Sequence, residues 1–375
     1  MTDFHWDDIR LSIQKKNKKD VENALTRSGF LSIEDFKALL SPAAQPYLET
    51  MAGISHSLTI KRFGRTIQLY APVYVSNYCT NFCTYCGFSC KNSPERKVLN
   101  RCEFLNECGY LHSQKITHIL LVSGESNIHA SALYFKDLIA AIRSRFHNIC
   151  IEVQPLSAPE YEELIQCGLD AVYIYQETYN KKQYGSYHPK GPKSDYEYRL
   201  RTPERACGAG ITRAGLGVLL GLEDWAADIA CMGMHLRALQ KKYWKTRFSF
   251  SFPRLRPAEG MLPPKVTVSN RDLAQIICAC RLFDEDIDLV LSTRESAGLR
   301  NKLIPLGITA ISAGSKTSPG GYTGETGTLE QFRIDDERSP ESVSKYLGSI
   351  GYETVWKDWA EELHPGPGTE ARFSK

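Results

Sequence analysis

A regular alternation of short apolar runs with longer helical stretches dominates the sequence after residue 65. Eight runs rich in β-branched and aromatic residues have the length of strands and occupy residues 67–76, 117–123, 149–155, 171–176, 214–220, 247–252, 287–292 and 308–313. Segments with helical spacing lie between them, among them 131–146, 159–167, 228–243 and 270–283. Eight such units over roughly 250 residues match a (β/α)8 TIM-type barrel in number and length.

A doubly wound open sheet is the alternative α/β architecture. It usually has fewer strands and a glycine-rich turn after its first strand. No glycine-rich loop follows the run at residues 67–76, so the sequence favours the barrel.

Two polar stretches flank the alternating region. Residues 1–65 have helical character, with Ser32 and Asp35 at the spacing of a capping box and Ser41 and Pro42 opening a further helix. A polar segment begins near residue 317 and contains a last helical pattern at 340–349. We therefore expect an N-terminal helical extension (1–65), a barrel (66–316) and a C-terminal extension that packs on the barrel or forms a lid (317–375).

Composition narrows the functional class. The formal net charge is +3 and charges of both signs are scattered, so neither nucleic acid nor a membrane surface is predicted as a partner. The sequence shows no secretory signal and no stretch of 18 or so apolar residues, which predicts a soluble, cytoplasmic protein with reduced thiols. Twelve cysteines in 375 residues are too few for a disulfide scaffold.

Three of these cysteines form a motif directly after the first predicted strand. Cys79, Cys83 and Cys86 have the spacing C-x3-C-x2-C, which suits one tight loop presenting three thiolates to an inorganic cluster. A zinc site or a ferredoxin cluster normally requires a fourth ligand, for which Cys90 is the only near candidate. Three thiolates on a [4Fe–4S] cluster leave one iron open to bind a substrate or cofactor.

This motif resembles that of the radical S-adenosylmethionine (SAM) superfamily. The resemblance implies a full or partial (β/α) barrel in which the open iron chelates the amino and carboxylate groups of SAM. Reduction then cleaves SAM to methionine and a 5′-deoxyadenosyl radical. Tyr85, before the third cysteine, resembles the aromatic residue that packs near the adenine, although a loop aromatic that shields the cluster has the same pattern.

Two glycine-containing segments resemble further SAM-binding elements of this superfamily. Gly124 and Glu125, after the second predicted strand, resemble the segment that receives the SAM amino group, for which a carboxylate is a charge-assisted acceptor. A bare Gly-Glu pair also occurs where a helix starts. Gly217 and Gly221, in a pattern that ends at Asp224, resemble the adenine-side segment, which usually ends in Glu.

Longer strings resemble those of the aromatic amino acid lyases within this superfamily. They occur in the family's order at residues 70–77, 153–156, 175–179, 251–257, 292–296 and 319–322, and the match extends from 6–10 to 355–359. The sequence looks most like the tyrosine lyases of thiamine thiazole biosynthesis. The related lyases of hydrogenase maturation carry a second cluster on C-terminal cysteines, whereas the 95 residues after Cys280 contain no cysteine.

The resemblance implies a radical lyase that acts on L-tyrosine. The deoxyadenosyl radical would abstract a hydrogen, most plausibly from the amino nitrogen, and the Cα–Cβ bond would break. The products would be 2-iminoacetate and p-cresol, with 5′-deoxyadenosine and methionine. Because 2-iminoacetate hydrolyses easily, a closed barrel and direct delivery to a partner would be useful.

Charged residues at the predicted strand ends are the candidates for substrate binding. Arg294, at the end of the seventh predicted strand, can grip the tyrosine carboxylate bidentately. Glu177, at the end of the fourth, can bind the SAM ribose or the substrate ammonium, or form a structural salt bridge. Arg254 or Arg256 can meet the SAM carboxylate. Two residues are position-based candidates for lining the substrate cavity, Tyr74 and Ser315.

The implied partners are a thiazole synthase and a reductant such as flavodoxin or ferredoxin. Two other functions remain open from the sequence: a radical SAM lyase for tryptophan or another amino acid, and a non-catalytic Fe–S scaffold. The nine cysteines outside the motif lie mostly in helical or strand patterns, where a small buried hydrophobic residue is the default interpretation.

Overall fold

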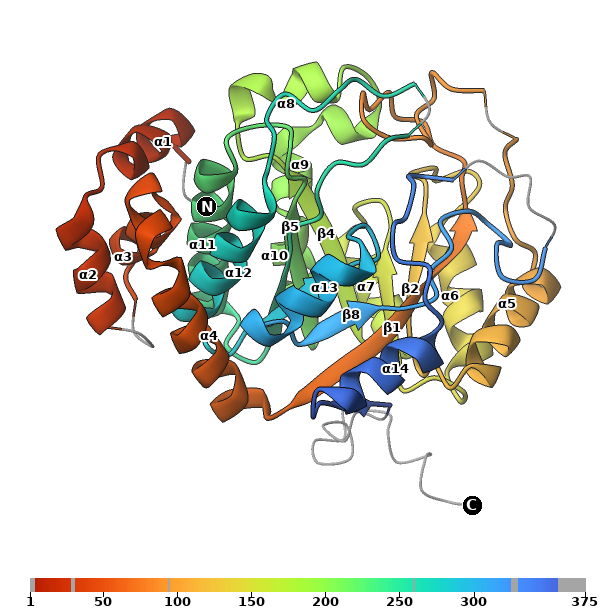
Figure 1. Ribbon diagram of the computed structural model, residues 1–375. Helices are drawn as coiled ribbons and strands as arrows, with labels where there is room; N and C mark the ends of the chain where they lie inside the picture. The colour runs from red at the N-terminus through yellow and green to blue at the C-terminus, as the bar shows by residue number, and fades with distance from the viewer. Residues whose placement is uncertain (1–3, 28–30, 94, 259, 325–329, 357–375) are drawn as a thin grey trace.

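Eight parallel strands close into a barrel in the computed structural model, which describes residues 4–27, 31–93, 95–258, 260–324 and 330–356 (Figure 1). The strands follow the order β2-β3-β4-β5-β6-β7-β8-β1, and β1 pairs with β2 to complete the ring. This confirms the predicted (β/α)8 barrel. The strand bounds are β1 (Thr66–Ser76), β2 (His118–Ser123), β3 (Asn148–Glu152), β4 (Ala171–Glu177), β5 (Arg213–Val218), β6 (Arg247–Ser251), β7 (Asp288–Leu291) and β8 (Ala310–Ser312).

Each of the eight predicted runs overlaps one of these strands. A short ninth strand, β9 (Glu353–Val355), was not predicted; it pairs in parallel with β1 outside the ring, with Thr66 opposite Glu353. Three residues give too little periodicity to be recognised as a strand.

Helices cover the outside of the ring and both flanks. Their bounds are α1 (Trp6–Gln14), α2 (Lys18–Thr26), α3 (Ile33–Leu40), α4 (Leu48–Phe63), α5 (Arg101–Ser113), α6 (Ala132–Ile142), α7 (Ala158–Gln166), α8 (Lys181–Tyr187), α9 (Tyr196–Leu200), α10 (Thr202–Gly208), α11 (Trp225–Lys242), α12 (Asn270–Phe283), α13 (Ala297–Leu303) and α14 (Pro340–Ser349).

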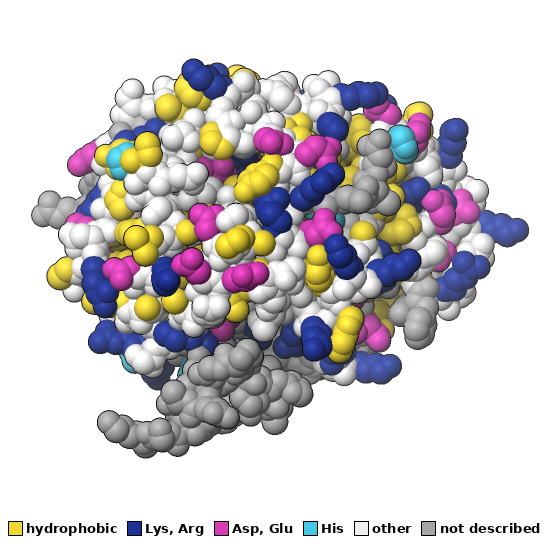
Figure 2. All heavy atoms as spheres, turned by 180° about the vertical axis from the view of Figure 1, so that it is seen from behind, with side chains coloured by type: hydrophobic (Ala, Val, Ile, Leu, Met, Phe, Trp, Pro, Cys, Tyr) yellow, Lys and Arg dark blue, Asp and Glu magenta, His cyan; other side chains and the backbone are white. Residues whose placement is uncertain are grey.

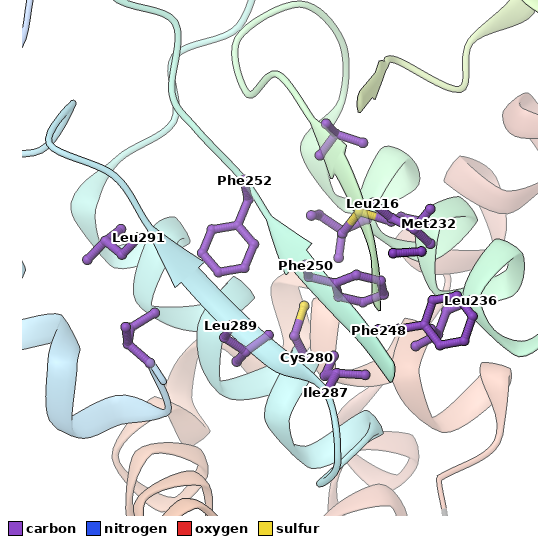
Figure 3. Packing of buried hydrophobic residues seen from close by; sticks show 14 of the residues in the cluster. Leu216, Met232, Leu236, Phe248, Phe250, Phe252, Cys280, Ile287, Leu289 and Leu291 are labelled. Atoms are coloured by element: carbon purple, nitrogen blue, oxygen red, sulfur yellow. The ribbon is translucent and has the colours of Figure 1, made fainter. Parts of the chain in front are cut away.

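Alternation along the strands separates the core outside the barrel from its interior. Phe248, Phe250 and Phe252, around β6, are buried with Leu236 of α11 and Cys280 of α12 (Figure 3). Successive strand residues point to opposite faces, so the serines between these phenylalanines face the barrel interior. The interior therefore holds polar groups, while the outer layer supplies most of the apolar burial.

The N-terminal helices lie against α11 and α12. The Trp6 indole Nε1 donates a hydrogen bond to the Asp228 carboxylate of α11 at 2.8 Å, and Phe36 of α3 stacks on Phe283 of α12 with ring centroids 4.2 Å apart. The capping box predicted for Ser32 and its partner three residues later is confirmed. A 3-10 helix follows at Pro42–Tyr47.

The chain after β8 crosses the carboxyl-terminal end of the barrel and then descends its side. The Glu107 carboxylate of α5 accepts hydrogen bonds from the backbone N–H groups of Tyr322 and Thr323. Farther on, the N–H groups of Asp335 and Asp336 donate to the Thr293 carbonyl. The segment is thus tied to the barrel at two places. Residues 357–359, which end the resemblance noted in the sequence, lie outside the described residues.

The surface of the described part mixes both charges. Figure 2 shows Lys and Arg side chains interspersed with Asp and Glu over the face seen from behind. Within the described ranges, no helix combines the length and apolar character needed to cross a membrane.

Candidate active site

A cavity opens at the carboxyl-terminal end of the barrel, where barrel enzymes bind their substrates. Its lining comes from the loop after β1, from the ends of β2, β3, β4, β6 and β7, and from the segment after β8. Eight of the predicted site residues line it: Cys79, Tyr85, Cys83, Cys86, Gly124, Glu125, Glu177 and Arg294. The fold therefore brings together residues more than 200 positions apart in the sequence.

The cysteine loop is held by its backbone rather than by regular secondary structure. The Thr80 N–H donates to the Glu125 carbonyl at 3.0 Å, and the Phe82 N–H donates to the Lys190 carbonyl at 3.0 Å. At the end of the loop, the Gly87 N–H donates to the Gln331 carbonyl at 3.1 Å. The loop is thus fixed by β2, by the excursion after β4 and by the C-terminal segment.

The three thiols are largely withdrawn from solvent. Burial raises the pKa of Cys79 to about 11 and also raises the pKa values of Cys83 and Cys86. Thiols in this state are neutral, and a bound metal must displace their protons to form thiolates. The Gln331 side-chain amide lies 3.9 Å from the Cys86 sulfur as a donor.

The donor set on the cavity side of this loop consists of three thiols, the number that the resemblance assigns to a cluster with one open iron. Among the described residues, no three His, Cys, Asp or Glu side chains are grouped to hold one metal ion. Thiolates that bind three different irons of one cluster stay farther apart than ligands that converge on one ion. Cys90 is exposed and outside the cavity lining, whereas the three thiols of the motif line it.

Gly124 allows the cysteine loop to approach the end of β2. A Cβ atom built at this position would lie 2.3 Å from the Tyr78 carbonyl oxygen and 3.1 Å from the Cys79 Cβ. No larger residue fits without moving the loop. The glycine predicted for SAM binding therefore also sets where the first cysteine lies.

Four charged groups form a network on one wall of the cavity. Arg199 Nη1 donates to Glu125 at 2.7 Å, and Lys193 Nζ donates to Glu177 at 2.6 Å. Burial opposes ionisation of Glu125, but the charges of Arg199 and Lys193 bring its pKa below the ordinary value. Glu125 is therefore an anion in the unliganded protein and retains lone pairs for an ammonium.

Neither cation of this network was predicted. Lys193 and Arg199 lie in the 24-residue region between Glu177 and Thr202 that carries α8 and α9, and no local pattern distinguishes them from surface charges. Glu177 itself has a left-handed backbone, with φ +70°, which is uncommon for a residue with a side chain. Its salt bridge with Lys193 is one of the three roles considered for it from the sequence.

Tyr85 lines the cavity and is fixed in orientation. Its hydroxyl lies 2.7 Å from His188 Nε2, and His188 Nδ1 lies 2.9 Å from the Tyr184 carbonyl oxygen. A carbonyl can only accept, so Nδ1 carries the proton and Nε2 accepts from the Tyr85 hydroxyl. Burial lowers the pKa of His188, consistent with this neutral ring.

Arg294 enters the cavity from the end of β7. Its guanidinium lies 3.4 Å from the centroid of the Phe332 ring, and Nη1 donates a long hydrogen bond, 3.5 Å, to the Arg254 carbonyl. Phe332 and Gln331 come from the C-terminal segment, which explains why the sequence did not indicate them: they sit in an irregular stretch without periodicity.

Three predicted cofactor-binding residues lie outside the cavity lining: Gly217, Gly221 and Arg254. The Arg254 guanidinium is bound to Glu295 and to the Val268 carbonyl, so each of its three nitrogen atoms already donates a hydrogen bond. Arg256, the alternative on the same strand end, does line the cavity.

The glycine pattern on β5 has a packing role. A Cβ at Gly217 would lie 2.3 Å from the Tyr175 ring, and Gly221 has φ +118°. Asp224 caps α11 by accepting from the Ala227 N–H. The buried acid at this turn is its neighbour Glu223, which binds Asn180, Tyr187 and Lys265.

The remaining position-based candidates also lie beside the cavity rather than in its lining. The Tyr74 hydroxyl donates to Gln331 Oε1 at 2.6 Å, and the Ser315 hydroxyl is buried. Of the nine cysteines outside the motif, six are buried, as expected for small hydrophobic residues. Cys90 and Cys102 are exposed.

Comparison with known proteins identifies two family regions in the chain. Residues 73–228 match the radical SAM superfamily, and residues 251–353 match the biotin and thiamin synthesis associated domain. The first region contains the cysteine loop and the charged network. The second contains Arg294 and the C-terminal segment that reaches into the cavity.

Curated and solved relatives agree with this assignment. The 2-iminoacetate synthases of Escherichia coli and Salmonella typhimurium are each 47% identical, covering 96% and 95% of this chain and 95% and 94% of their own lengths. The crystal structure of HydG, a maturase of the [FeFe]-hydrogenase, superposes with a TM-score of 0.91 at 30% identity, covering 99% of this chain and 84% of that one. Methylornithine synthase shares the fold, with a TM-score of 0.72 at 19% identity over 92% of this chain and 99% of that chain.

The curated relatives match nearly the whole chain, and the superfamily match surrounds the three cysteines. The barrel also has its cavity at the end expected for such enzymes. The chain therefore belongs to the 2-iminoacetate synthase family of radical SAM lyases.

Proposed function

We propose that the chain cleaves the Cα–Cβ bond of L-tyrosine to 2-iminoacetate and p-cresol, supplying the thiazole moiety of thiamine. One observation carries the proposal: a single cavity is lined by three buried or half-buried thiols and by a guanidinium that is available to a carboxylate. When bound, a [4Fe–4S] cluster and SAM would supply a carbon radical that abstracts hydrogen from the substrate. SAM would leave as methionine and 5′-deoxyadenosine.

Cys79, Cys83 and Cys86 are the proposed cluster ligands. Glu125 would accept the SAM ammonium, because it is ionised, lines the cavity and lies beside the cysteine loop. Tyr85 would lie against the adenine, with its ring held by His188.

The opposite side of the cavity suits the amino acid. Arg294 would bind the tyrosine carboxylate through two parallel N–H···O bonds. Phe332 packs on the guanidinium and, with Phe88, gives the cavity aromatic surface. Such surface excludes water from a product that hydrolyses readily. A thiazole synthase as the receiving protein and a flavodoxin or ferredoxin as the reductant complete the proposal.

Turnover of the reconstituted protein tests this function. Protein loaded anaerobically with iron and sulfide, then given SAM, a reductant and tyrosine, should release p-cresol and 5′-deoxyadenosine in equal amounts. Tryptophan in a parallel reaction should give neither product above background. Formation of deoxyadenosine without tyrosine consumption, or turnover of tryptophan instead, would contradict the substrate assignment.

A further inference from the structure

Most charged side chains in the cavity are already matched by a partner of opposite sign. Arg199 binds Glu125 at 2.7 Å, and Lys193 binds Glu177 at 2.6 Å. The cation at the end of β6 is also paired, because Arg256 contacts Glu295 and Asp335 at 2.9 and 3.1 Å. These groups hold one another in place.

Two charged groups of the cavity lining stand apart. Within the described part of the chain, Arg294 makes no ion pair within 4.0 Å, and the Glu152 side chain makes neither an ion pair nor a hydrogen bond. Leaving a carboxylate unpaired in a largely enclosed site is costly. A site that keeps one cation and one anion without partners is complementary to a ligand that carries both signs.

The two groups come from opposite walls. Glu152 ends β3 and Arg294 follows β7, and these strands are four positions apart in the ring of eight. Burial raises the pKa of Glu152 and lowers that of Arg294, and the opposite charge of each group partly offsets the shift of the other. A ligand that touches both must therefore lie across the centre of the cavity.

We propose that Glu152 binds the ammonium group of the amino acid substrate whose carboxylate is held by Arg294. The inference rests on the proposed function, because it assigns a second anchor for the same amino acid. A zwitterion brings one charge of each sign and matches the two unpaired groups without changing the net charge of the cavity.

Glu177 was the alternative acceptor for this ammonium, and its surroundings argue against it. Its carboxylate is bound to Lys193 and lies 3.8 Å from Arg199, so a third cation there would meet two positive charges. Glu152, in contrast, has no cation bound to it in the described part of the chain. Burial and the nearby charge of Glu177 raise its pKa to about 7, and a cation beside it would favour its ionised form.

The phenol hydroxyl of tyrosine is the other group that Glu152 could meet. A neutral hydroxyl would leave the charge of the carboxylate largely uncompensated, whereas an ammonium cancels it. Substrate analogues separate the two possibilities, because phenylalanine lacks only the hydroxyl and 3-(4-hydroxyphenyl)propionate lacks only the amino group.

The experiment measures equilibrium binding of these ligands to the reconstituted protein with SAM and without a reductant. Glu152→Gln, which preserves shape, should weaken tyrosine and phenylalanine alike by about tenfold or more, the size expected for a lost charged contact. It should leave binding of 3-(4-hydroxyphenyl)propionate within about twofold. Glu162→Gln, at an exposed position of α7, is the matched control and should change none of the three.

Other outcomes overturn the inference. If Glu152→Gln weakens tyrosine but not phenylalanine, Glu152 binds the phenol instead. If the unmutated protein binds 3-(4-hydroxyphenyl)propionate as tightly as tyrosine, no residue binds the ammonium, and this arm does not depend on the folding of a variant. Release of p-cresol by the unmutated protein tests the proposed function independently. If p-cresol forms but the binding results contradict the role of Glu152, only the Glu152 assignment is wrong.

Discussion

Arg294 and Arg300 lie six residues apart, one at the mouth of the barrel and one at the junction of α13 with the C-terminal segment. The guanidinium of Arg300 is fully buried, bound to Asp336 and to the Ser312 carbonyl. Arg294 faces the cavity and meets an aromatic ring instead of a carboxylate. The contrast separates two uses of buried charge: a group whose partners come from the fold supports the fold, and a group without them is available to a ligand.

Cys83, which lines the cavity, and Cys280, which is buried in α12, allow the same comparison between a ligand-binding and a structural residue. The largest effect on activity is expected here. Cys83→Ala should abolish p-cresol formation and lower the bound iron, because it removes one of three proposed ligands. Cys280→Ala, in the core of α12, should keep both iron and activity and cost about 1–2 kcal/mol of unfolding free energy through a small cavity. Iron analysis, turnover and denaturation of the two variants test this difference. Full activity of Cys83→Ala would contradict the cluster assignment.

Replacing Arg294 and Arg300 with alanine, one at a time, tests the distinction between a ligand-binding and a structural arginine directly. Arg294→Ala should raise the KM for tyrosine about 100-fold, since a charged contact with the substrate is lost, and should leave stability within about 0.5 kcal/mol. Arg300→Ala should destabilise the protein by about 3 kcal/mol, because Asp336 keeps only Arg338 as a partner. Steady-state kinetics and denaturant unfolding measure both; equal effects of the two variants on stability would contradict the distinction.

Asp228 extends the comparison to pH. Its carboxylate, like the Arg300 guanidinium, has its partners within the fold, but its protonation state changes with pH. Burial outweighs the hydrogen bonds from Tyr179, Trp6 and Thr178 and raises the pKa of Asp228 from 3.8 to about 7. The folded state therefore keeps its proton to higher pH than the unfolded state, and this contribution to stability is lost as pH rises from about 4 to 7, on the order of 4 kcal/mol in all.

Asp228→Asn should flatten that part of the stability profile, since an amide oxygen keeps the three acceptor contacts without titrating. Unfolding followed at several pH values measures the slope. The exposed control Asp137→Asn should retain the slope of the unmutated protein, and an unchanged slope in Asp228→Asn would refute the assignment.

Gly124→Ala tests the smallest effect, the fit between β2 and the cysteine loop. The added Cβ would meet the Tyr78 carbonyl, so the loop must shift, and iron affinity should fall by about tenfold. Gly53→Ala, which meets no atom within 4 Å in α4, should leave iron binding unchanged and stabilise the helix by up to about 1 kcal/mol. Iron titration of both variants tests the difference; equal affinities would show that the loop tolerates the change.

The strands were predictable because each one buries a run of apolar residues between two layers, and such runs are visible in the sequence. Site residues next to those runs were predictable too: the three cysteines, Glu125 and Arg294 follow directly from strand ends. Glu152 was overlooked although it lies in the third run. Its two-residue spacing from Cys150, which faces the barrel interior, places it on the same face.

Residues delivered by irregular segments could not be predicted from local patterns. Lys193 and Arg199 reach the cavity from the excursion after β4, and Gln331 and Phe332 from the segment after β8. Their positions depend on distant contacts such as that of Gln331 with Tyr74. Arg254 does not line the cavity for a related reason, because its guanidinium binds the nearby Glu295.

The hydrogen bond between Tyr74 and Gln331 joins residues 257 positions apart. Contacts of such separation carry a large loop-closure entropy, so they form late in folding and slow it. The cavity is thus complete only when the C-terminal segment has docked and the barrel has closed, and closing the barrel also pairs the distant strands β1 and β8. In refolding experiments, iron binding with the native spectrum should therefore follow the slowest kinetic phase.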